Sequence, residues 1–294
     1  MAELTFYAQG DRRAAMWLKM AEDSALLQGH RIVYGGSDIS FASHASYLQG
    51  WRSSAKVQVA VNMKEHAPKP LSDDILVLSP LPSHESRARY RRKEWEGYKP
   101  HRRIRCVPFG PGEPVTRWVQ RKPALYNAFL SDNLLEFRKL IGPQSQQRAI
   151  GFVGYAGDWG RKGRADAIGA ECYFTDQRDR LTADAYLRWM AACGCVPHFP
   201  GLCWNTHRFI EAVLIGTPLV CCREECRQLT FVPPVSSKNV ILIDGWTDRD
   251  SVAKGLNHRN SITQAADESY RNGWSIPSLI SSLIVDLLEP SADE

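Results

Sequence analysis

The stretch WNTHRFIEAVLIGTPLVCC (204–222) begins with polar residues and continues as an apolar helical pattern. Asn205 or Thr206 can cap the amino end of such a helix, because their side-chain oxygens accept hydrogen bonds from free N–H groups of the first turn. Those N–H groups and the helix dipole favour a bound anion, a phosphate above all. Arg208 can donate a forked pair of hydrogen bonds to the same phosphate. Glu211 lies on the same face, where its carboxylate can accept hydrogen bonds from two adjacent ribose hydroxyls.

Arg208 and Glu211 also have a simpler interpretation, as a surface ion pair at i,i+3 that would contribute little to stability. The rest of the helix is apolar and is expected to pack against a sheet. It ends at Gly216, turns at Thr217-Pro218, and continues into the β-prone run 219–222. The stretch therefore predicts a buried helix with a polar amino end suited to a diphosphate.

Strand-like and helix-like segments alternate along the whole chain, which is typical of parallel sheets covered by helices. The expected strands are 4–10, 30–36, 56–62, 74–80, 103–111, 149–157, 171–175, 195–199, 219–222 and 239–245. The other expected helices are 12–29, 123–147, 182–194, 247–256 and the region from 261, with a bend at Trp274 and Pro277. GPQSQQ (142–147) is interpreted as a linker. The sequence thus predicts an α/β protein of two Rossmann-like domains, 1–145 and 146–294, facing a central cleft, with the C-terminal helix as a candidate to cross back.

The composition is that of a soluble globular protein: 294 residues, of which 44% are hydrophobic and 23% charged. The amino terminus has no basic region followed by an apolar one. The most apolar late segment, 277–289, is interrupted by serines and Asp286 and is too short to span a bilayer. We therefore expect a cytoplasmic protein with no membrane span. Nothing in the sequence predicts its oligomeric state.

Eight cysteines occur, at positions 106, 172, 193, 195, 203, 221, 222 and 226. Disulfides are not expected in a cytosolic chain of this size. The group Cys193, Cys195, His198, Cys203 and His207 lacks the ligand spacing of common structural zinc sites. Several cysteines lie in apolar strand-like runs, so we interpret them as buried free thiols and expect no bound metal.

The segment HRFIEAVLIGTPLV (207–220) resembles the donor-binding element of GT-B glycosyltransferases, in which R-x-x-E-A is followed by hydrophobic residues and a Gly-x-Pro turn. It is particularly similar to the exostosin-like branch, where a Pro- and Gly-containing segment precedes the helix, as FPG (199–201) does here. The resemblance implies a co-substrate that is a nucleotide sugar, a UDP-sugar before others, and no tightly bound cofactor. It places Glu211 at the ribose and the following residues at the diphosphate: Thr206, His207 and Arg208.

A second segment, FVGYAGDWGRKGR (152–164), is similar to the first strand and loop of a GT-B C-terminal domain. There, a glycine turn is followed by basic residues that hold the donor diphosphate. The resemblance implies this role for Arg161 and Lys162, with Gly154 and Gly157 allowing close approach of the backbone. The alternative is a solvated basic turn. The resemblance extends over about residues 148–245, and the first domain matches only in its alternation of elements.

Transfer with inversion requires a general base that deprotonates the acceptor hydroxyl. Asp11 and Asp38 are the first candidates, because each follows a glycine-containing turn after an expected strand; His84 and Glu85 are reserves. Basic groups and helix amino ends can stabilise the leaving diphosphate without a metal ion. The family often has a second acidic residue after the E-A helix, and its absence here favours inversion.

One segment, 84–105, contains nine Arg or Lys residues and three Glu residues, so it carries the whole positive balance of a chain whose net charge is +5. Tyr90, Trp95 and Tyr98 are interleaved with these cations, a combination that can contact phosphates and stack on bases. The candidate nucleic-acid contacts are Arg87, Arg89, Arg91, Arg92, Lys93, Arg102 and Arg103. We therefore consider DNA with a hydroxylated base as the acceptor, as in phage DNA-modifying glucosyltransferases.

Several alternatives remain open for the basic segment and for the chain. The segment could be an ordinary solvated lid, or it could bind an acidic glycan or a lipid-linked acceptor. The chain could be a non-catalytic nucleic-acid-binding protein on a GT-B scaffold. It could also be a nucleotide-sugar epimerase, which would act without an acceptor and leave the basic segment unexplained.

Overall fold

The computed structural model describes residues 1–63, 71–80, 103–108, 110–142, 144–154, 160–174, 181–199, 207–226 and 235–289. The chain divides into two compact units. Unit 1 contains the described residues of 1–109 and 273–289, and unit 2 contains those of 110–226 and 235–272. The helical segments after Gly110 therefore group with unit 2 and the C-terminal helix groups with unit 1, which differs from a single boundary at 145/146.

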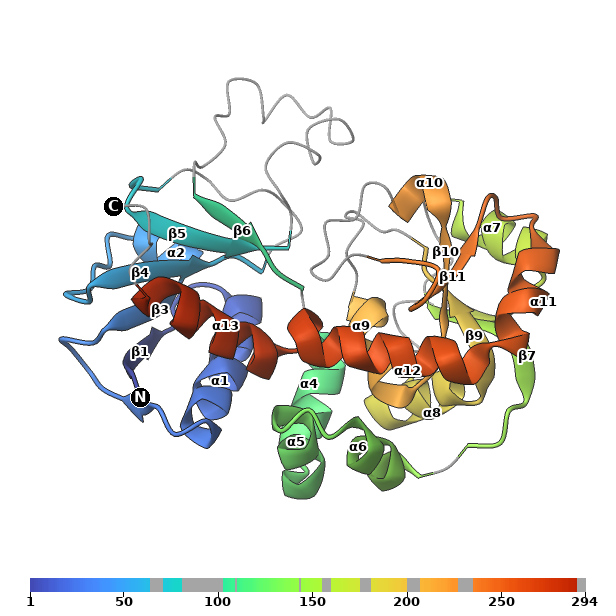
Figure 1. Cartoon of the computed structure of the whole chain (residues 1–294), viewed down its shortest axis with the longest axis horizontal. Helices are drawn as coiled ribbons and strands as arrows, with labels where there is room; N and C mark the ends of the chain where they lie inside the picture. Colours follow the sequence, from blue (N-terminus) through green and yellow to red (C-terminus); the bar gives the residue numbers. More distant parts are fainter. Residues whose placement is uncertain are drawn as a thin grey trace. The chain divides into compact units, whose positions relative to one another are not determined.

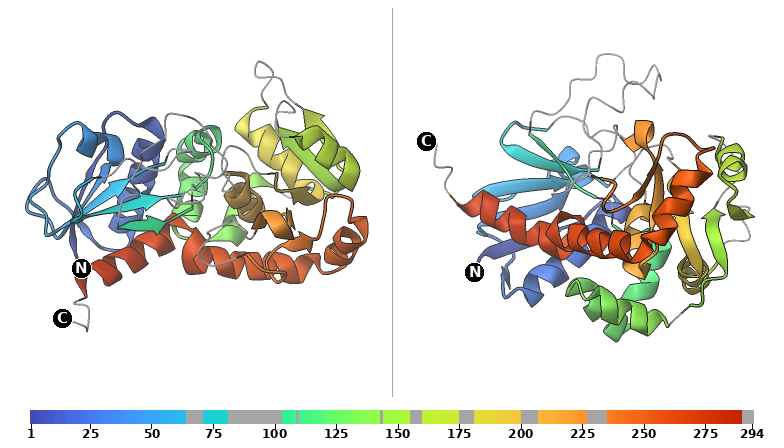
Figure 2. Two further views of the ribbon diagram at one scale, coloured as in Figure 1. Left: turned by 90° about the horizontal axis from the view of Figure 1, so that it is seen from above. Right: turned by 45° about the vertical axis from the view of Figure 1, so that its right-hand side comes forward.

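Unit 1 is built on a parallel sheet with the strand order β2-β1-β3-β4-β5-β6 (Figure 1). Its strands are β1 (Glu3–Tyr7), β2 (Arg31–Ile32), β3 (Ile39–Ser43), β4 (Val57–Val61), β5 (Ile75–Ser79) and β6 (Ile104–Cys106). Its helices are α1 (Arg12–Leu27), α2 (His44–Leu48) and α13 (Ile276–Leu288). α13 packs beside α1, as Figure 1 and the right-hand view of Figure 2 show.

Helices cover both faces of this sheet because successive side chains of a strand point to opposite faces. On one face, Tyr47 of α2 packs in a cluster with Ala42 and Ala60. Phe6 and Phe41 precede Tyr7 and Ala42 by one residue on β1 and β3, and their rings stack at 5.1 Å on the other face. Both faces are therefore apolar, as in the doubly covered sheet that the sequence predicts.

Unit 2 contains a second parallel sheet with the strand order β11-β10-β9-β7-β8. Its strands are β7 (Arg148–Gly154), β8 (Glu171–Phe174), β9 (Cys193–Pro197), β10 (Leu219–Cys222) and β11 (Ile241–Ile243). The helices before β7 are α4 (Glu113–Gln120), α5 (Pro123–Leu130) and α6 (Leu134–Ile141). Those that follow are α7 (Arg161–Ile168), α8 (Ala183–Ala191), α9 (His207–Ile215), α10 (Arg223–Cys226), α11 (Arg249–Asn257) and α12 (Arg259–Ser269). The two parallel sheets confirm the predicted α/β class.

Several elements differ from the sequence prediction. The strand expected at 30–36 is only Arg31–Ile32, and β3 begins after the glycine turn at Ile39. The run ISFAS is entirely buried although two of its five residues are serines. Because these serines interrupt the apolar pattern, the sequence analysis did not predict this central strand. α4 was also not expected; its signal is Pro114 in the first turn after Gly112, a position that proline favours. The bend expected near Trp274 lies at Gly273, whose φ is 154°.

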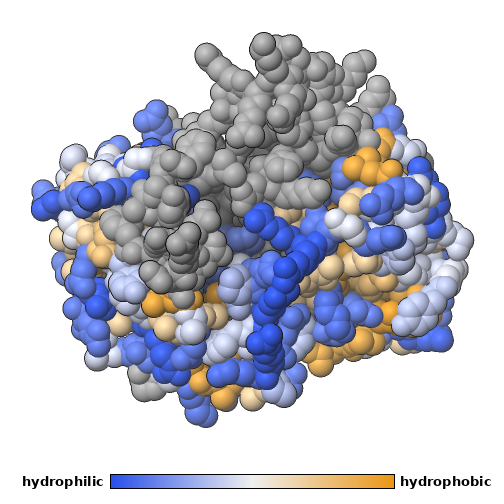
Figure 3. All heavy atoms as spheres, turned by 180° about the vertical axis from the view of Figure 1, so that it is seen from behind, coloured by the Kyte–Doolittle hydropathy of each residue, from blue (hydrophilic) through white to orange (hydrophobic). Residues whose placement is uncertain are grey.

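Within the described residues, no helix is both long enough and apolar enough to span a bilayer. On the face shown in Figure 3, hydrophobic surface occurs as separate patches among hydrophilic residues. Such scattered apolar exposure is normal for a folded protein and marks no particular partner.

Candidate functional site

α9 is the buried helix that the opening sequence pattern predicts. Every side chain from Phe209 to Ile215 is buried, and the helix lies between β9 and β10 in the chain. Gly216 follows with a φ of 73°, a left-handed conformation that ends a helix with little strain only at glycine. The amino end of α9 therefore lies at the carboxyl edge of the sheet, where parallel α/β sheets bind ligands.

Arg208 in the first turn of α9 reaches the carboxyl end of β7. Its Nη2 donates a hydrogen bond of 2.8 Å to the carbonyl oxygen of Val153. Its guanidinium lies over the Phe152 ring, 4.5 Å from the centroid. A Cβ on Gly154 would lie 2.8 Å from Arg208 Nη2, so glycine is what permits this approach. The structure thus brings together Gly154 and Arg208, one residue from each of the two segments that resemble a donor site.

The Nε of Arg208 is buried and has no hydrogen-bond partner within the described residues. A buried donor without a partner costs free energy. An oxygen of a bound anion is the kind of group that would satisfy it, because a guanidinium matches a phosphate or carboxylate with two parallel hydrogen bonds.

Glu211 is buried, with 4% of its surface exposed, and both carboxylate oxygens have protein partners. Oε1 accepts a hydrogen bond of 2.8 Å from the N–H of Gly112, and Oε2 accepts one of 2.7 Å from the Tyr186 hydroxyl. The interpretation as an exposed ion pair with Arg208 does not fit this burial. Contact with a ribose remains a prediction, and it would use the remaining lone pairs of the two oxygens.

Two residues that sequence reasoning did not select join this cluster. Tyr186 on α8 is half-buried; desolvation raises the pKa of its hydroxyl well above the usual value, and the Glu211 carboxylate raises it further. The hydroxyl is therefore a permanent hydrogen-bond donor. Gly112 precedes α4, and a Cβ there would lie 3.0 Å from Glu211 Oε1. No spacing rule links these residues to α9.

His207 also contacts the segment before α4. Its Nδ1 lies 2.9 Å from the carbonyl oxygen of Gly110. Segment 110–112 therefore packs against the first turn of α9 within unit 2, whereas the sequence analysis included it in the first domain, 1–145. Thr206, the proposed cap, lies outside the described residues.

Arg161 and Lys162 are the first two residues of α7, the helix that follows β7. Gly160 precedes them with a φ of 66°. Lys162 is exposed and Arg161 is half-buried. Cations at the amino end of a helix oppose the helix dipole, so a bound anion there would relieve the repulsion. Gly157 lies outside the described residues, and the diphosphate role of the two basic residues remains a prediction.

Asp11 lies at the carboxyl edge of the unit 1 sheet, after β1. It caps α1: its Oδ1 accepts hydrogen bonds of 3.0 and 3.1 Å from the N–H groups of Arg13 and Ala14. This is the edge at which a residue that acts on a ligand is expected, so the position supports its choice as a candidate base.

Asp38 lies at the opposite, amino edge of the same sheet, because it directly precedes β3 rather than following a strand. Its Oδ2 accepts a 3.0 Å hydrogen bond from the N–H of Glu3, and its Oδ1 lies 2.9 Å from Lys56 Nζ. These contacts, the Glu3 N–H first, hold the pKa of the carboxyl below its usual value. The geometric reason for choosing Asp38 as a base therefore does not hold, and the unrecognised strand β3 is the cause.

Replacing Asp38 with asparagine is expected to lower thermal stability at neutral pH and to have no such effect in acid. A depressed folded-state pKa contributes stability above the unfolded value, and that contribution is lost as the pH falls through the folded pKa. The measurement is the melting temperature of wild type and Asp38→Asn between about pH 3 and pH 7. A difference in melting temperature that does not shrink as the pH is lowered through this range would contradict this assignment.

Most of the predicted nucleic-acid residues lie outside the described residues: Arg87, Arg89, Arg91, Arg92, Lys93 and Arg102, as do His84 and Glu85. Arg103 is described and exposed. Its Nη1 donates a 3.0 Å hydrogen bond to the carbonyl oxygen of Asp74. The nucleic-acid role of this segment remains a prediction.

Six described cysteines are free: Cys172, Cys193, Cys195, Cys221, Cys222 and Cys226. Cys193 and Cys195 are buried in β9, and burial raises the pKa of each thiol to about 12. His198 packs edge-on against the Phe209 ring at 5.6 Å. A search of the described residues finds no group of three or more possible ligands for a metal ion.

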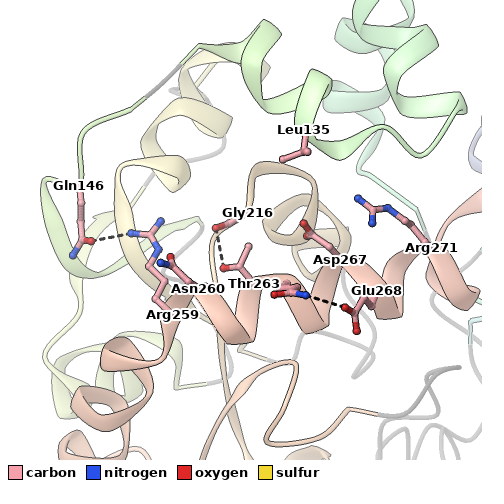
Figure 4. Close-up of a pocket in the computed structure, with 10 residues that line it drawn as sticks. Leu135, Gln146, Gly216, Arg259, Asn260, Thr263, Asp267, Glu268 and Arg271 are labelled. Carbon is pink, nitrogen blue, oxygen red and sulfur yellow. Dashed lines mark hydrogen bonds between the residues drawn. The ribbon is translucent and has the colours of Figure 1, made fainter.

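A pocket of about 730 Å³ lies at the other end of α9 (Figure 4). Gly216, which ends α9, forms part of its wall, and α12 supplies Thr263 and Asp267. The nine residues of α9 rise by roughly 14 Å at 1.5 Å per residue, so this pocket is distinct from the Arg208 cluster.

Comparison with known proteins gives a likeness in structure alone. No family model matches the chain, and no curated protein matches it. An alpha-glucosyltransferase solved with UDP has a TM-score of 0.58 at 8% identity, covering 98% of this chain and 100% of that one. An alpha-glucosyltransferase with UDP and a 13-mer DNA containing a central A:G mismatch has a TM-score of 0.56 at 9% identity, with the same coverage. AviGT4, a glycosyltransferase of avilamycin A biosynthesis, has a TM-score of 0.51 at 12% identity, covering 98% of this chain and 97% of that one.

These likenesses extend over nearly the full length of each chain, and they agree with the two parallel sheets. The chain has the GT-B glycosyltransferase fold, which confirms the fold predicted from the two sequence segments.

Proposed function

We propose that this chain transfers a sugar from a nucleotide-sugar donor to an acceptor hydroxyl. The observation that carries the proposal is the position of Arg208. Its guanidinium is held at the carboxyl end of β7 by Val153 and Phe152, beside Gly154, with a buried Nε that has no partner in the described part of the chain. A diphosphate at this point would receive the guanidinium and the N–H groups of the first turn of α9.

A UDP-sugar is the donor we propose first. Two structures that share this fold were solved with UDP, and both are described as alpha-glucosyltransferases. Arg161 and Lys162, at the amino end of α7, are proposed as further diphosphate contacts, because they follow β7 within the same unit. Glu211 is proposed to reach the ribose with the lone pairs that Gly112 and Tyr186 leave open.

The first experiment measures donor binding directly. The melting temperature of the protein is recorded with UDP-, GDP-, ADP- and CMP-sugars, and sugar release is followed by chromatography. We expect one nucleotide series to raise the melting temperature, because a ligand that binds only the folded state stabilises it. Conversion of the donor, without an acceptor and without sugar release, into an isomeric nucleotide sugar would indicate an epimerase. DNA binding with no response to any nucleotide sugar would indicate a non-catalytic nucleic-acid-binding protein.

For the acceptor, we propose DNA that carries a hydroxylated base. Two observations support it: the basic segment 84–105 of the sequence, and a protein of this fold solved with UDP and DNA. Electrophoretic mobility shift with duplex DNA over a salt series tests it. Binding through phosphates weakens steeply as salt rises. Absence of any salt-dependent shift would exclude DNA and leave an acidic glycan or lipid-linked acceptor.

We propose Asp11 as the general base, and Asp11→Asn separates this role from helix capping. Asparagine caps a helix about as well as aspartate, so the melting temperature should change little. An amide cannot accept the acceptor proton, so turnover should fall by about 100-fold or more. The measurement is the turnover number beside the melting temperature. Unchanged turnover in Asp11→Asn would remove Asp11 as the base.

We propose a metal-independent reaction with inversion. Helix amino ends and Arg208 supply positive charge for the leaving diphosphate. Position 219, eight residues after Glu211, is the buried apolar Leu219, so a second acidic residue does not follow at that spacing. Activity that persists in EDTA supports a metal-independent reaction. Nuclear magnetic resonance of the anomeric proton in the first-formed product decides between inversion and retention.

A further inference from the structure

Tyr186 on α8 is half-buried, and its hydroxyl reaches α9. The hydroxyl donates a 2.7 Å hydrogen bond to Glu211 Oε2. α8, which carries Tyr186, contacts both α9 and α4 within the same unit (Figure 1). A tyrosine between packed helices often has only a structural role. The hydrogen bond from the Tyr186 hydroxyl to Glu211 indicates a further one.

The Glu211 carboxylate has one protein donor on each oxygen. The N–H of Gly112 serves Oε1 at 2.8 Å, and the Tyr186 hydroxyl serves Oε2. A buried carboxylate must be satisfied by hydrogen bonds, and one that is satisfied on both oxygens is fixed in orientation. Glu211 belongs to the same helical face as Arg208, three residues earlier. Fixing Glu211 therefore also fixes the turn that carries the guanidinium.

Arg208 is also a neighbour of the tyrosine. Its positive charge lowers the pKa of the Tyr186 hydroxyl and thereby opposes the larger effects of burial and of Glu211. The three side chains form one electrostatic group at the amino end of α9. A neutral hydroxyl is the member that can bind the carboxylate without adding charge.

We propose that Tyr186 is a positioning residue for the donor diphosphate: its hydroxyl and the N–H of Gly112 hold Glu211, and through it they hold the first turn of α9 with Arg208. This rests on the proposed function, since it assumes a nucleoside diphosphate at that turn. It adds a residue that neither motif nor spacing indicates.

The test compares Tyr186→Phe, Glu211→Gln and the double variant with wild type. Phenylalanine keeps the aromatic ring, and glutamine keeps the shape of residue 211 and can still accept the Gly112 N–H with its oxygen. Tyr126→Phe is the matched control, because Tyr126 on α5 is also half-buried, stacks on Phe129 away from the Arg208 cluster, and loses the same hydroxyl. Affinities for UDP and for uridine are measured by calorimetry and ligand-observed magnetic resonance, with GDP and ADP also tested on wild type.

We expect Tyr186→Phe to bind UDP about 5- to 10-fold more weakly, the effect of one lost hydrogen bond. Uridine affinity should fall by a smaller factor, because uridine keeps the ribose that Glu211 is proposed to contact but lacks the diphosphate. In the Glu211→Gln background the same change should alter UDP affinity less than about 2-fold. A structural role alone would lower the melting temperature and leave the ratio of UDP to uridine affinity constant.

Three results would overturn the proposal. UDP affinity of Tyr186→Phe could equal that of wild type, or UDP and uridine affinity could fall in parallel. The effect could also be equally large in the Glu211→Gln background, which would show that Tyr186 does not act through Glu211. If wild type binds none of UDP, GDP and ADP, the proposed function itself fails and this role fails with it. Binding by wild type with no effect of the variant rejects only the role of Tyr186.

Discussion

Replacing Arg208 with alanine is expected to weaken binding of UDP by about 10- to 100-fold, with little change in melting temperature. The guanidinium would make charge-assisted hydrogen bonds to the diphosphate, whereas its bond to the Val153 carbonyl is a single contact at the end of β7. Arg208→Lys should have an intermediate effect, because an ammonium keeps the charge but cannot form the forked pair. Calorimetric titration of UDP measures both.

The matched control is Arg148→Ala, at the other end of the same strand. Arg148 also lies over an aromatic ring, that of Trp189 at 4.8 Å, and pairs with Glu171 at 2.6 Å. Removing it deletes an equivalent side chain away from the cluster, so UDP affinity should stay within about 2-fold of wild type. Equal losses in the two alanine variants would mean that general loss of positive charge, and not the position of Arg208, governs binding.

Replacing Asp267 with alanine is expected to destabilise unit 2 by about 3 kcal/mol, the lower end of the range for breaking a buried ion pair. Arg138 on α6 donates hydrogen bonds to Asp267 Oδ1 and Oδ2 at 2.5 and 2.8 Å. The same guanidinium donates to the carbonyl oxygens of Val213 and Leu214 in the last turn of α9. Removal of the carboxylate leaves a half-buried cation unpaired and loosens the cap of that helix.

The melting temperature is expected to fall by roughly 6 to 12 °C, at 2 to 4 °C per kcal/mol for a unit of this size. Lys139→Ala is the control on the same helix, because Lys139 is 79% exposed and its 3.5 Å pair with Glu136 should contribute little. A loss in Asp267→Ala no larger than in Lys139→Ala would show that the Arg138–Asp267 pair does not hold α9. Denaturant unfolding gives an independent free energy for each variant.

Local chemistry made some features of this chain predictable. A left-handed glycine at 216, apolar residues through 209–215 and a β-prone run at 219–222 are each determined by neighbours in the chain. The strand β3 escaped prediction because Ser40 and Ser43 are buried, and hydrophobic alternation does not reveal a small polar residue in a core. Because β3 was not predicted, Asp38 was expected at the carboxyl edge of the sheet, whereas it precedes β3 at the amino edge.

By itself, the sequence determined the α/β alternation, the apolar face and polar amino end of α9, and the resemblance that gave the fold. The tertiary structure alone decided which groups meet there. Glu211 meets Gly112, 99 residues away, and Tyr186, 25 residues away, and Arg208 meets Val153, 55 residues away. Helical periodicity specifies which face of a helix is buried but not what covers it, because strand order and the packing of other helices bring distant residues together.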